Sequence, residues 1–512
     1  MAADVVLNAG RAQLLVEGAP FLILGGEVHN SSASGLEWME EKVWPVVRQL
    51  RLNTLLVPVY WETVEPREGE FHFELVDGVL AQARREGVRL VLLWFGLWKN
   101  ALSTYAPSWV KQDTKRFFRS ELFEQLDFVR SRPGISPCCQ AAIDADAKGF
   151  AALMAHLKKV DEVQGTVLFL QVENEVGLLG SDRDYSPVAQ QWFEADIPRE
   201  VAANFNCGGN WEDAFGRQAC SQFMAWCFAR ALEVIASAGK KEYDIPLYVN
   251  AWTIQYDGEY EGSYPTGGPV VENIKMWRLT APSIAWYSPD IYKNNFAAEC
   301  RKYALQDNPL FIPEARNSLD AGSNALYAIA QCGAFGFCPF AVEDMLQTSQ
   351  AFELPGAYQE QGINGRKRDE THAAHYLKEA YGVLDSLKPF LSPQAAVSVQ
   401  GYIFEDDRRI GMRFCQYRAR ITCIGVYPHL PLPAGVVIEM AEDEFIIAGI
   451  LSEVEFLPLC GERSRPEFLS LEEGYFSAGQ WHCMRIMNGD EHRVTFTDQY
   501  KILRIKLRKD GR

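Results

Sequence analysis

Eight short β-rich runs alternate with helical stretches, and the tail that follows them contains only β-type runs. This pattern predicts an α/β fold in which a (β/α)8 TIM barrel is followed by a smaller, all-β, sandwich-like C-terminal domain. Strands that alternate with helices are parallel and joined by right-handed crossovers, and eight such units favour a closed barrel over an open sheet. The pattern changes near Pro389, which predicts a barrel in residues 1–390 and the β domain in residues 391–512.

Each predicted barrel strand is a short β-rich run that ends in polar or aromatic residues. In chain order, these runs are 21–28, 53–60, 89–95, 166–172, 246–250, 284–292, 309–314 and 334–340. Between them, apolar residues recur at helical spacing, which predicts helices over 38–50, 73–86, 144–160, 212–237 and 371–387. Two long segments, 99–142 and 180–210, follow strands, so we expect them at the carboxyl end of the barrel, where such folds build their sites.

Composition and charge restrict the partners of the protein. The 512 residues include 50 Lys and Arg against 67 Asp and Glu, a formal charge of −17, which argues against nucleic acid or an anionic membrane as the main partner. The hydrophobic fraction of 48 % excludes wholesale disorder. The N-terminus MAADVVLNAG has no basic and apolar leader pattern, and the 12 cysteines form no CxxC pair. We therefore expect a cytoplasmic protein with reduced thiols.

Two carboxylates end two distant strands. Glu175 lies in QVENEVG after the fourth predicted strand, and Glu314 lies in FIPEAR after the seventh. Buried carboxylates are costly unless they are paired or solvated, and at the carboxyl rim of a barrel both would face one cleft. Two carboxyl groups that face one cleft, one protonated and one ionised, are the minimal machinery for glycoside hydrolysis.

Several motifs resemble the family 35 β-galactosidases, within the large clan of retaining (β/α)8 glycosidases. QVENEVG resembles the QxENEYG signature of that family, PVYWETVEPREGEFHF its second-strand segment, and GGEVHNSS stands in the place of its first-strand segment. The runs WFGLWKN, YAPSWVK, SPDIY and GFCPFAVED are most similar to the bacterial and fungal subgroup whose barrel is followed by a small β domain. The resemblance covers residues 10–390 well and the tail more loosely.

The resemblance implies roles for four residues. Glu175 would be the acid/base and Glu314 the nucleophile of a retaining exo-β-glycosidase, with roughly 5–5.5 Å between the two carboxyl groups. Asn174 would bind the 2-hydroxyl of the sugar, and Tyr292 would donate a hydrogen bond to Glu314. The sequence departs from the family at Val176, where many members carry Tyr, and at Glu62, where many carry Asn. It also lacks, after the third strand, the Cys-Ala-Glu run of animal members.

Further polar and aromatic residues at strand ends are candidates for sugar contact. They are Glu27, His29, Tyr60, Glu62, Lys99, Asn100, Asn250, Trp252 and Glu343. Alternatives exist for several: Lys99 as a solvated loop cation, His29 as a packing residue and Glu343 as a member of a surface ion pair. Glu173 could face the same side as Glu175 or belong to a buried network. Either Trp252 or Trp286 could form the apolar platform for a sugar ring, and either could be packing.

The sequence favours hydrolysis of terminal β-galactosyl residues from an oligosaccharide or other β-galactoside, by double displacement. Because two carboxylates and water suffice, we expect no cofactor and no metal; His372 and His375 lack completing ligands nearby. The alternatives are a β-glucosidase or a transglycosidase on the same fold, and a non-catalytic carbohydrate-binding protein. The oligomeric state stays open, with a symmetric homodimer as one option.

Overall fold

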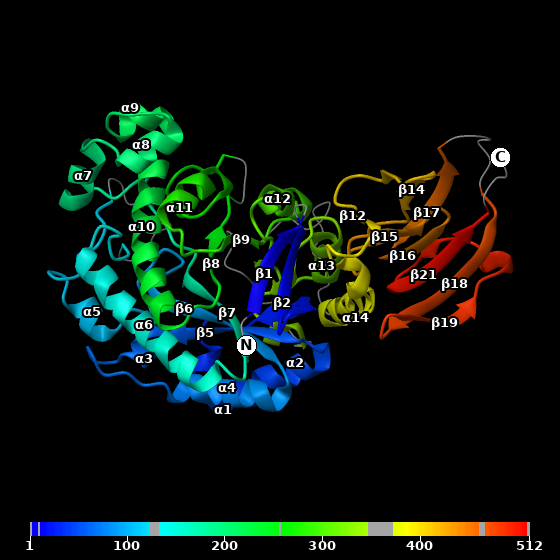
Figure 1. The fold of residues 1–512 in the computed structure, drawn as a ribbon, viewed down its shortest axis with the longest axis horizontal. Helices are drawn as coiled ribbons and strands as arrows, with labels where there is room; N and C mark the ends of the chain where they lie inside the picture. The colour runs from blue at the N-terminus through cyan, green and yellow to red at the C-terminus, as the bar shows by residue number, and fades with distance from the viewer. Residues whose placement is uncertain are drawn as a thin grey trace.

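The computed structural model describes residues 3–8, 11–122, 133–254, 258–346, 372–459 and 466–508. Eight parallel strands form a closed barrel in the order β10-β11-β4-β5-β6-β7-β8-β9, with helices around it (Figure 1). The predicted (β/α)8 barrel followed by an all-β domain is therefore confirmed. The barrel strands are β4 (Ile23–Glu27), β5 (Thr54–Tyr60), β6 (Arg89–Lys99), β7 (Val167–Asn174), β8 (Leu247–Trp252), β9 (Trp286–Ile291), β10 (Ile312–Ala315) and β11 (Gly336–Pro339).

Helices cover the outside of the barrel because each presents an apolar face to the strands. α4, for example, buries Val76, Val79, Leu80 and Ala83 and ends at Gly87, whose left-handed φ of 69° suits a helix C-terminus. The major helices are α2 (Trp44–Leu50), α4 (Glu74–Glu86), α6 (Gln140–Asp161), α10 (Ala219–Glu242), α11 (Ile274–Thr280), α12 (Phe296–Tyr303), α13 (Ala321–Ala330) and α14 (Ala373–Leu391). Among the described residues, no helix combines the length and the apolar character that crossing a membrane requires.

Three details differ from the sequence prediction. The predicted strand 21–28 is divided, because its first residue belongs to β3 (Ala19–Phe21). β3 pairs with β2 (Arg11–Val16), and β2 pairs with β1 (Ala3–Asn8), in a small antiparallel sheet that was not predicted from the sequence. The predicted helix 38–50 begins with α1 (Leu36–Trp38) and a π-helical turn over Met39–Val43. The long segment 180–210 contains helices α7 (Pro187–Glu194) and α8 (Arg199–Phe205), whereas in the segment 99–142 residues 123–132 lie outside the described residues.

The C-terminal domain consists of two antiparallel sheets. The six-stranded sheet has the order β12-β15-β16-β21-β18-β19 and the four-stranded sheet the order β13-β14-β17-β20. Their strands are β12 (Ser398–Ile403), β13 (Arg409–Arg413), β14 (Tyr417–Cys423), β15 (Ala434–Ala441), β16 (Glu444–Ile450), β17 (Ser452–Pro458), β18 (Phe468–Ser477), β19 (Gln480–Ile486), β20 (Thr495–Phe496) and β21 (Lys501–Leu507). Phe445, Phe456 and Leu503 belong to an apolar core shared by the two sheets.

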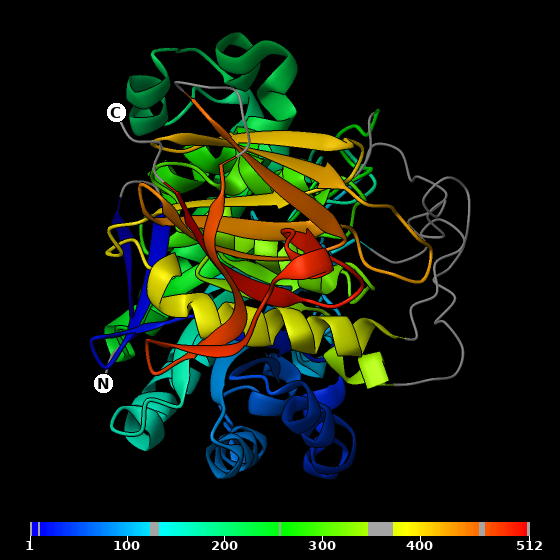
Figure 2. The ribbon, with the colours of Figure 1, turned by 90° about the vertical axis from the view of Figure 1, so that its right-hand side faces the viewer.

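The β domain packs on the barrel through helices α13 and α14. Figure 2 shows α14 lying across the view, with some strands of the β domain above it and others crossing in front of it. The Ser323 hydroxyl donates to the carbonyl of Leu432 at 2.6 Å, and the backbone N–H of Gly401 donates to Gln331 at 2.9 Å. Val436 and Ile438 of β15 belong to the same apolar core as the barrel. The division at residue 390 stays a prediction; α14 ends at Leu391, within one residue of it.

Candidate active site

The barrel brings the sequence-predicted site residues to one end, because all eight parallel strands end there. Each strand, or the segment just after it, contributes at least one of them. The residues on the strands themselves are Glu27 (β4), Tyr60 (β5), Lys99 (β6), Asn174 (β7), Asn250 and Trp252 (β8) and Glu314 (β10). The residues that lie just after a strand are His29 (β4), Glu62 (β5), Asn100 (β6), Glu175 (β7), Tyr292 (β9) and Glu343 (β11).

Three carboxyl groups form the centre of this end of the barrel. One oxygen each from Glu175, Asp290 and Glu314 lies within 4.8 Å of the other two, and all three residues are buried. Glu175 and Glu314, 4 % exposed each, come from strands on opposite sides of β8 and β9 in the barrel order. Buried carboxyl groups at this distance repel one another when ionised, so the site retains protons at neutral pH.

The backbone at the tip of β7 adopts unusual conformations that aim Glu175 into the site. Glu173 and Glu175 have φ values of 62° and 44°, in the left-handed region that non-glycine residues rarely occupy. The partner strand β6 is irregular at the same height: Trp94 pairs with Val172, but Lys99 pairs with Asn174. This bulge places Lys99 and the next residue, Asn100, beside the tip of β7.

A buried pair of carboxyl groups holds this irregular region. Glu173 accepts hydrogen bonds from the backbone N–H groups of Leu97 at 3.0 Å and Trp98 at 2.6 Å. Asp146 of α6 accepts from Leu97 at 2.9 Å and from the Trp94 indole at 2.7 Å. Burial and the charge of Asp146 raise the pKa of Glu173 well above its ordinary value. Glu173 is therefore a member of a buried network, the second of its two interpretations.

Glu175 accepts hydrogen bonds on its side chain and is fixed through its backbone. The Asn100 amide donates to its Oε2 at 2.6 Å, and its own backbone N–H donates to Oδ1 of Asn250 at 2.9 Å. Burial, and next the negative charge of Glu314, raise the pKa of Glu175 to about 7, against the opposing effects of Lys99 and a hydrogen bond from Asp290. A carboxyl group with this pKa can release and recover a proton near neutrality.

Glu314 has a different environment from Glu175. The hydroxyl of Tyr292, which follows β9, donates a hydrogen bond to its Oε1. Its Oε2 is buried and has no hydrogen-bond partner among the described residues. Burial and the charge of Glu314 raise the pKa of Tyr292, so this phenol stays neutral and remains a donor. Glu314 thus keeps one oxygen held by a donor and one available for a ligand.

Other polar atoms around the three acids are also buried without partners in the described part of the chain. They include Oε1 of Glu27, Nδ2 of Asn174 and Oε2 of Glu343. The Oδ1 atom of Asn174 accepts from the Lys99 ammonium at 2.7 Å, which leaves its N–H₂ group to face a ligand. Lys99 is only 5 % exposed, so the alternative of a solvated loop cation is wrong. Buried polar atoms normally have partners, so this set indicates a site for a polyhydroxylated ligand.

Glu343 belongs to a second group of contacts at the end of β4. Its Oε1 accepts from the backbone N–H of His29 at 2.9 Å and from the Ser32 hydroxyl at 2.6 Å. The His29 ring contacts Asp344 at 2.6 Å, and this hydrogen bond raises the pKa of His29. Glu343 is buried, so it is not part of a surface ion pair. The burial of Glu27, followed by the charge of Glu314, raises the pKa of Glu27 well above its ordinary value.

The aromatic residues at the rim divide into packing residues and exposed ones. Trp286 is 1 % exposed and stacks on Tyr248 at 5.5 Å, so it is a core residue. Trp252 at the end of β8 is partly exposed and remains the candidate platform for a sugar ring. Tyr60 stacks on Tyr105 at 5.3 Å beneath the same rim.

A separate ion pair, at 3.1 Å, joins the partly exposed Glu62 to Lys111.

Asp290 and Asp344 are site residues that were not predicted from the sequence. Asp290 lies two residues before Tyr292, and strand periodicity places alternate residues on one face, so a signal for it was present in SPDIY. Asp344 follows Glu343 directly and carried no such signal, because its contact with His29 joins residues from opposite ends of the barrel sequence.

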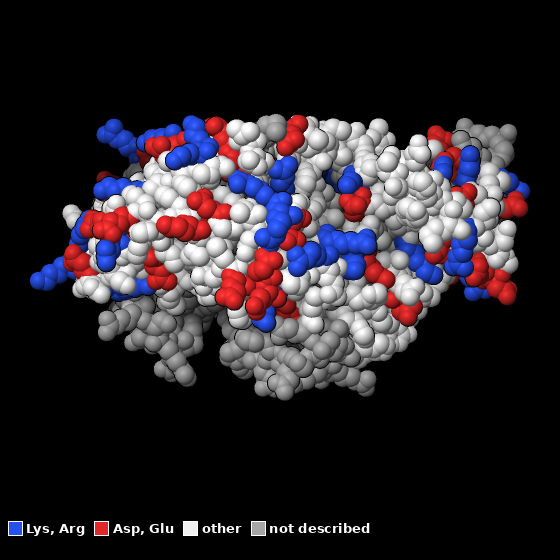
Figure 3. Space-filling view, turned by 90° about the horizontal axis from the view of Figure 1, so that it is seen from below, with Lys and Arg blue, Asp and Glu red and all other residues white. Residues whose placement is uncertain are grey.

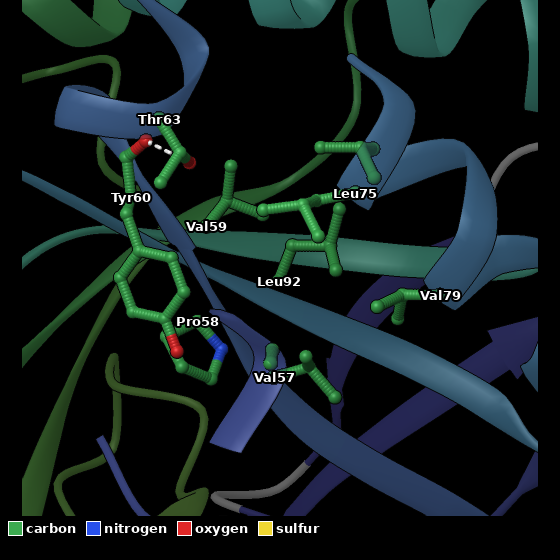
Figure 4. A pocket seen from close by; sticks show the side chains of 10 residues that line it. Val57, Pro58, Val59, Tyr60, Thr63, Leu75, Val79 and Leu92 are labelled. Atoms are coloured by element: carbon green, nitrogen blue, oxygen red, sulfur yellow. Dashed lines mark hydrogen bonds between the residues drawn. The ribbon is translucent and has the colours of Figure 1, made fainter. Parts of the chain in front are cut away.

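An apolar pocket lies beside the site, and Tyr60 is the site residue that lines it. It lies between β5 and α4 and is lined mainly by aliphatic side chains, among them Val57, Val79 and Leu92 (Figure 4). None of the acidic site residues lines it.

On the face drawn in Figure 3, basic and acidic side chains lie interspersed, without a broad area of one sign. The fold and the site together define a (β/α)8-barrel protein with a buried acidic centre at its carboxyl end.

Comparisons with known proteins connect parts of the chain to β-galactosidases. Residues 377–497, which include most of α14 and much of the β domain, match the family "Domain of unknown function (DUF5597)". The β-galactosidase of Xanthomonas manihotis is 28 % identical over 178 residues, which are 34 % of this chain and 27 % of that protein. The human β-galactosidase-1-like protein 3 is 25 % identical over 189 residues, 35 % of this chain and 25 % of that protein.

The matching region thus spans about a quarter of the length of these curated relatives. Among solved structures, the β-galactosidase of Bacillus circulans sp. alkalophilus superposes with a TM-score of 0.48 at 14 % identity. That superposition covers 72 % of this chain and 56 % of the other. About a third of this chain is similar, at low identity, to a protein named β-galactosidase and to one named β-galactosidase-1-like protein 3. The family 35 resemblance remains a sequence-based expectation.

Proposed function

We propose that the protein is a retaining exo-β-glycosidase that removes terminal β-galactosyl residues by double displacement. The observation that carries the proposal is the meeting of Glu175 and Glu314, from the tips of β7 and β10, with oxygens within 4.8 Å in a buried site. The relatives named β-galactosidase and β-galactosidase-1-like protein 3 support the choice of substrate class.

The different environments of the two acids support different roles. Glu175, with a pKa of about 7, is protonated in part of the molecules at neutral pH and donates its proton to the glycosidic oxygen as the bond to the leaving alcohol breaks. The Glu314 carboxylate attacks the anomeric carbon through its oxygen that has no protein partner, and a glycosyl ester forms. The Tyr292 hydroxyl holds the other oxygen of Glu314 in place.

Water then releases the sugar. The Glu175 carboxylate takes a proton from a water molecule, whose oxygen attacks the anomeric carbon and displaces Glu314. Retaining enzymes have carboxyl groups about 5–5.5 Å apart, whereas inverting enzymes need about 6.5–9.5 Å to admit the water between them. The close approach of the Glu175 and Glu314 oxygens supports retention.

The polar atoms without protein partners are suited to the hydroxyl groups of the sugar. Asn174 presents its amide N–H₂ beside Glu175, where the resemblance places the 2-hydroxyl. Glu27 and Glu343 each present a buried oxygen from the opposite side of the barrel mouth, and each can accept a hydrogen bond from a hydroxyl.

The roles can be assigned by the stereochemistry of azide rescue. We expect Glu314→Ala to lose turnover of an aryl β-galactoside, and Glu175→Ala to retain the first step when the leaving group is good. Azide in place of water should give Glu175→Ala a β-galactosyl azide, because it attacks the ester intermediate from the acid/base side. Azide in the cavity of Glu314→Ala should give the α-azide. NMR of the anomeric proton distinguishes the two products.

A matched control is Glu41→Ala, which removes an exposed glutamate of the helical turn Met39–Val43 and should turn over like the wild type. Full activity of Glu314→Ala, or the reversed pair of azide products, would contradict the assignment. A panel of aryl β-galactoside, β-glucoside and β-mannoside substrates with product analysis tests the sugar and separates hydrolysis from transfer. A higher kcat/KM for the glucoside than for the galactoside would overturn the assignment as a β-galactosidase. The assignment as a β-glycosidase would stand.

A further inference from the structure

Asp290 is a buried carboxyl group in the active site that the double-displacement chemistry does not use. It lies on β9, is fully buried, and has an oxygen within 4.8 Å of both Glu175 and Glu314. Its Oδ2 accepts a hydrogen bond from the Asn250 amide at 2.7 Å. Asn250 in turn accepts the backbone N–H of Glu175 at 2.9 Å, so one amide fixes Asp290 and Glu175 relative to each other.

An oxygen of Asp290 lies within 4.8 Å of an oxygen of Glu175, and a hydrogen bond between the two carboxyl groups raises the pKa of Asp290 and opposes the rise in the pKa of Glu175. An ionised carboxylate has only acceptor oxygens, so a hydrogen bond between two carboxyl groups requires a proton on one of them. Which of the two holds the proton depends on the charges that surround each.

The surroundings favour the proton on Asp290. Glu175 faces the Lys99 ammonium of β6 as well as Glu314 of β10. The largest charge effects on Asp290 come from acidic groups: Glu314, Glu175 and Glu27 of β4. The phenols of Tyr248 on β8 and Tyr303 on α12, both neutral, are its other titratable neighbours. Burial and these negative charges raise the pKa of Asp290 well above its ordinary value.

We propose that Asp290 is held as a neutral carboxylic acid that donates a hydrogen bond to Glu175 throughout the reaction. In this arrangement Asp290 is a positioning residue, because it acts on the substrate only through Glu175. When Glu175 has passed its proton to the leaving group, the donor from Asp290 stabilises the new carboxylate and orients it toward the incoming water. Asp290 keeps its own proton, so the proton balance of the reaction is unchanged. This inference rests on the proposed function.

The test compares Asp290→Asn with Asp290→Ala in the full-length protein. Asparagine is neutral, has nearly the same shape and can donate to Glu175 while it accepts from Asn250. In Asp290→Asn we expect the alkaline limb of the kcat/KM profile to stay within about half a pH unit of the wild type. In Asp290→Ala the donor is lost, so that limb should move to higher pH. With a good leaving group, kcat of Asp290→Ala should fall more than KM changes, because the second step needs the Glu175 carboxylate.

An ionised Asp290 predicts the opposite response. Replacing a negative charge beside Glu175 with a neutral amide would lower the alkaline limb of Asp290→Asn by about one pH unit or more. That result would overturn the inference. If Asp290 only packs against its neighbours, the alkaline limb of the kcat/KM profile stays in place in both variants, and that result would also overturn the inference.

A spectroscopic measurement separates this inference from the proposed function. At pH 8, above the pKa of about 7 of Glu175, infrared difference spectra of the wild type against Asp290→Asn should show the carbonyl band of a protonated carboxyl group. Absence of that band would overturn the inference even in an active enzyme. If no glycoside is turned over by the wild type, the proposed function fails, while the band still decides the protonation state of Asp290.

Discussion

Replacing Glu175 with glutamine is expected to stabilise the folded protein at alkaline pH while it removes the proton donor. Burial, and next the charge of Glu314, raise the pKa of Glu175 from 4.5 to about 7 in the folded state. A carboxyl group with a raised pKa binds its proton more tightly in the folded protein than in the unfolded chain. Its contribution to stability is complete below pH 4.5 and is lost as the pH rises through 7.

The magnitude follows from the size of the pKa shift. One pKa unit corresponds to about 1.4 kcal/mol, so ionisation of Glu175 costs the wild type about 3 kcal/mol of unfolding free energy by pH 8. A glutamine does not ionise and avoids this cost. It has a single acceptor oxygen where Glu175 has two, so we subtract about 1 kcal/mol for one weakened hydrogen bond. Glu175→Gln should therefore be about 2 kcal/mol more stable than the wild type at pH 8 and about 1 kcal/mol less stable at pH 4.5.

Calorimetry at the two pH values measures this difference. For a barrel of this length, 1 kcal/mol shifts Tm by about 1–2 °C, so the Tm difference between variant and wild type should be about 3–6 °C more positive at pH 8. The scan rate is kept constant, since large proteins often unfold irreversibly. The exposed Glu41→Gln serves as control and should show the same Tm difference at both pH values. An equal Tm difference for Glu175→Gln at pH 4.5 and pH 8 would refute the reasoning.

Three further predictions follow from other contacts. Lys99→Met removes the cation that lowers the pKa of Glu175, so the alkaline limb of the kcat/KM profile should move to higher pH. The neighbouring site residues would lose a contact that positions them, so kcat should fall about 10- to 100-fold. An alkaline limb that stays in place would argue against this electrostatic role of Lys99. Gly96→Ala places a Cβ 2.5 Å from Oδ2 of Asp146, so denaturant unfolding should show a loss of about 2 kcal/mol or more, whereas Gly208→Ala, with no atom within 4 Å, should be tolerated. In a chain truncated after α14, the helix α13, which is wholly buried in the full-length protein, becomes exposed to solvent. We expect the truncated protein to aggregate, which size-exclusion chromatography detects. A monodisperse truncated barrel would contradict this prediction.

The amino-acid sequence determined the architecture and the acidic pair. The eight strand runs could be predicted because buried parallel strands are short, apolar and bounded by polar residues, and this signal is local. Glu175 and Glu314 could be predicted because both directly end such runs, and parallel strands in a barrel end on one side. The same logic places Asp290, whose spacing from Tyr292 is that of neighbours on one face of a strand.

Only the tertiary structure decided how these groups interact. The contact between Asn100 and Glu175 depends on an irregular register between β6 and β7, which no local pattern encodes. Glu173 entered a buried network because α6 brings Asp146 to the same bulge. The protonation of Glu175 and Asp290 depends on burial and on charges from four strands at once. Such properties belong to positions in space, and residues far apart in the chain acquire them only when the barrel closes.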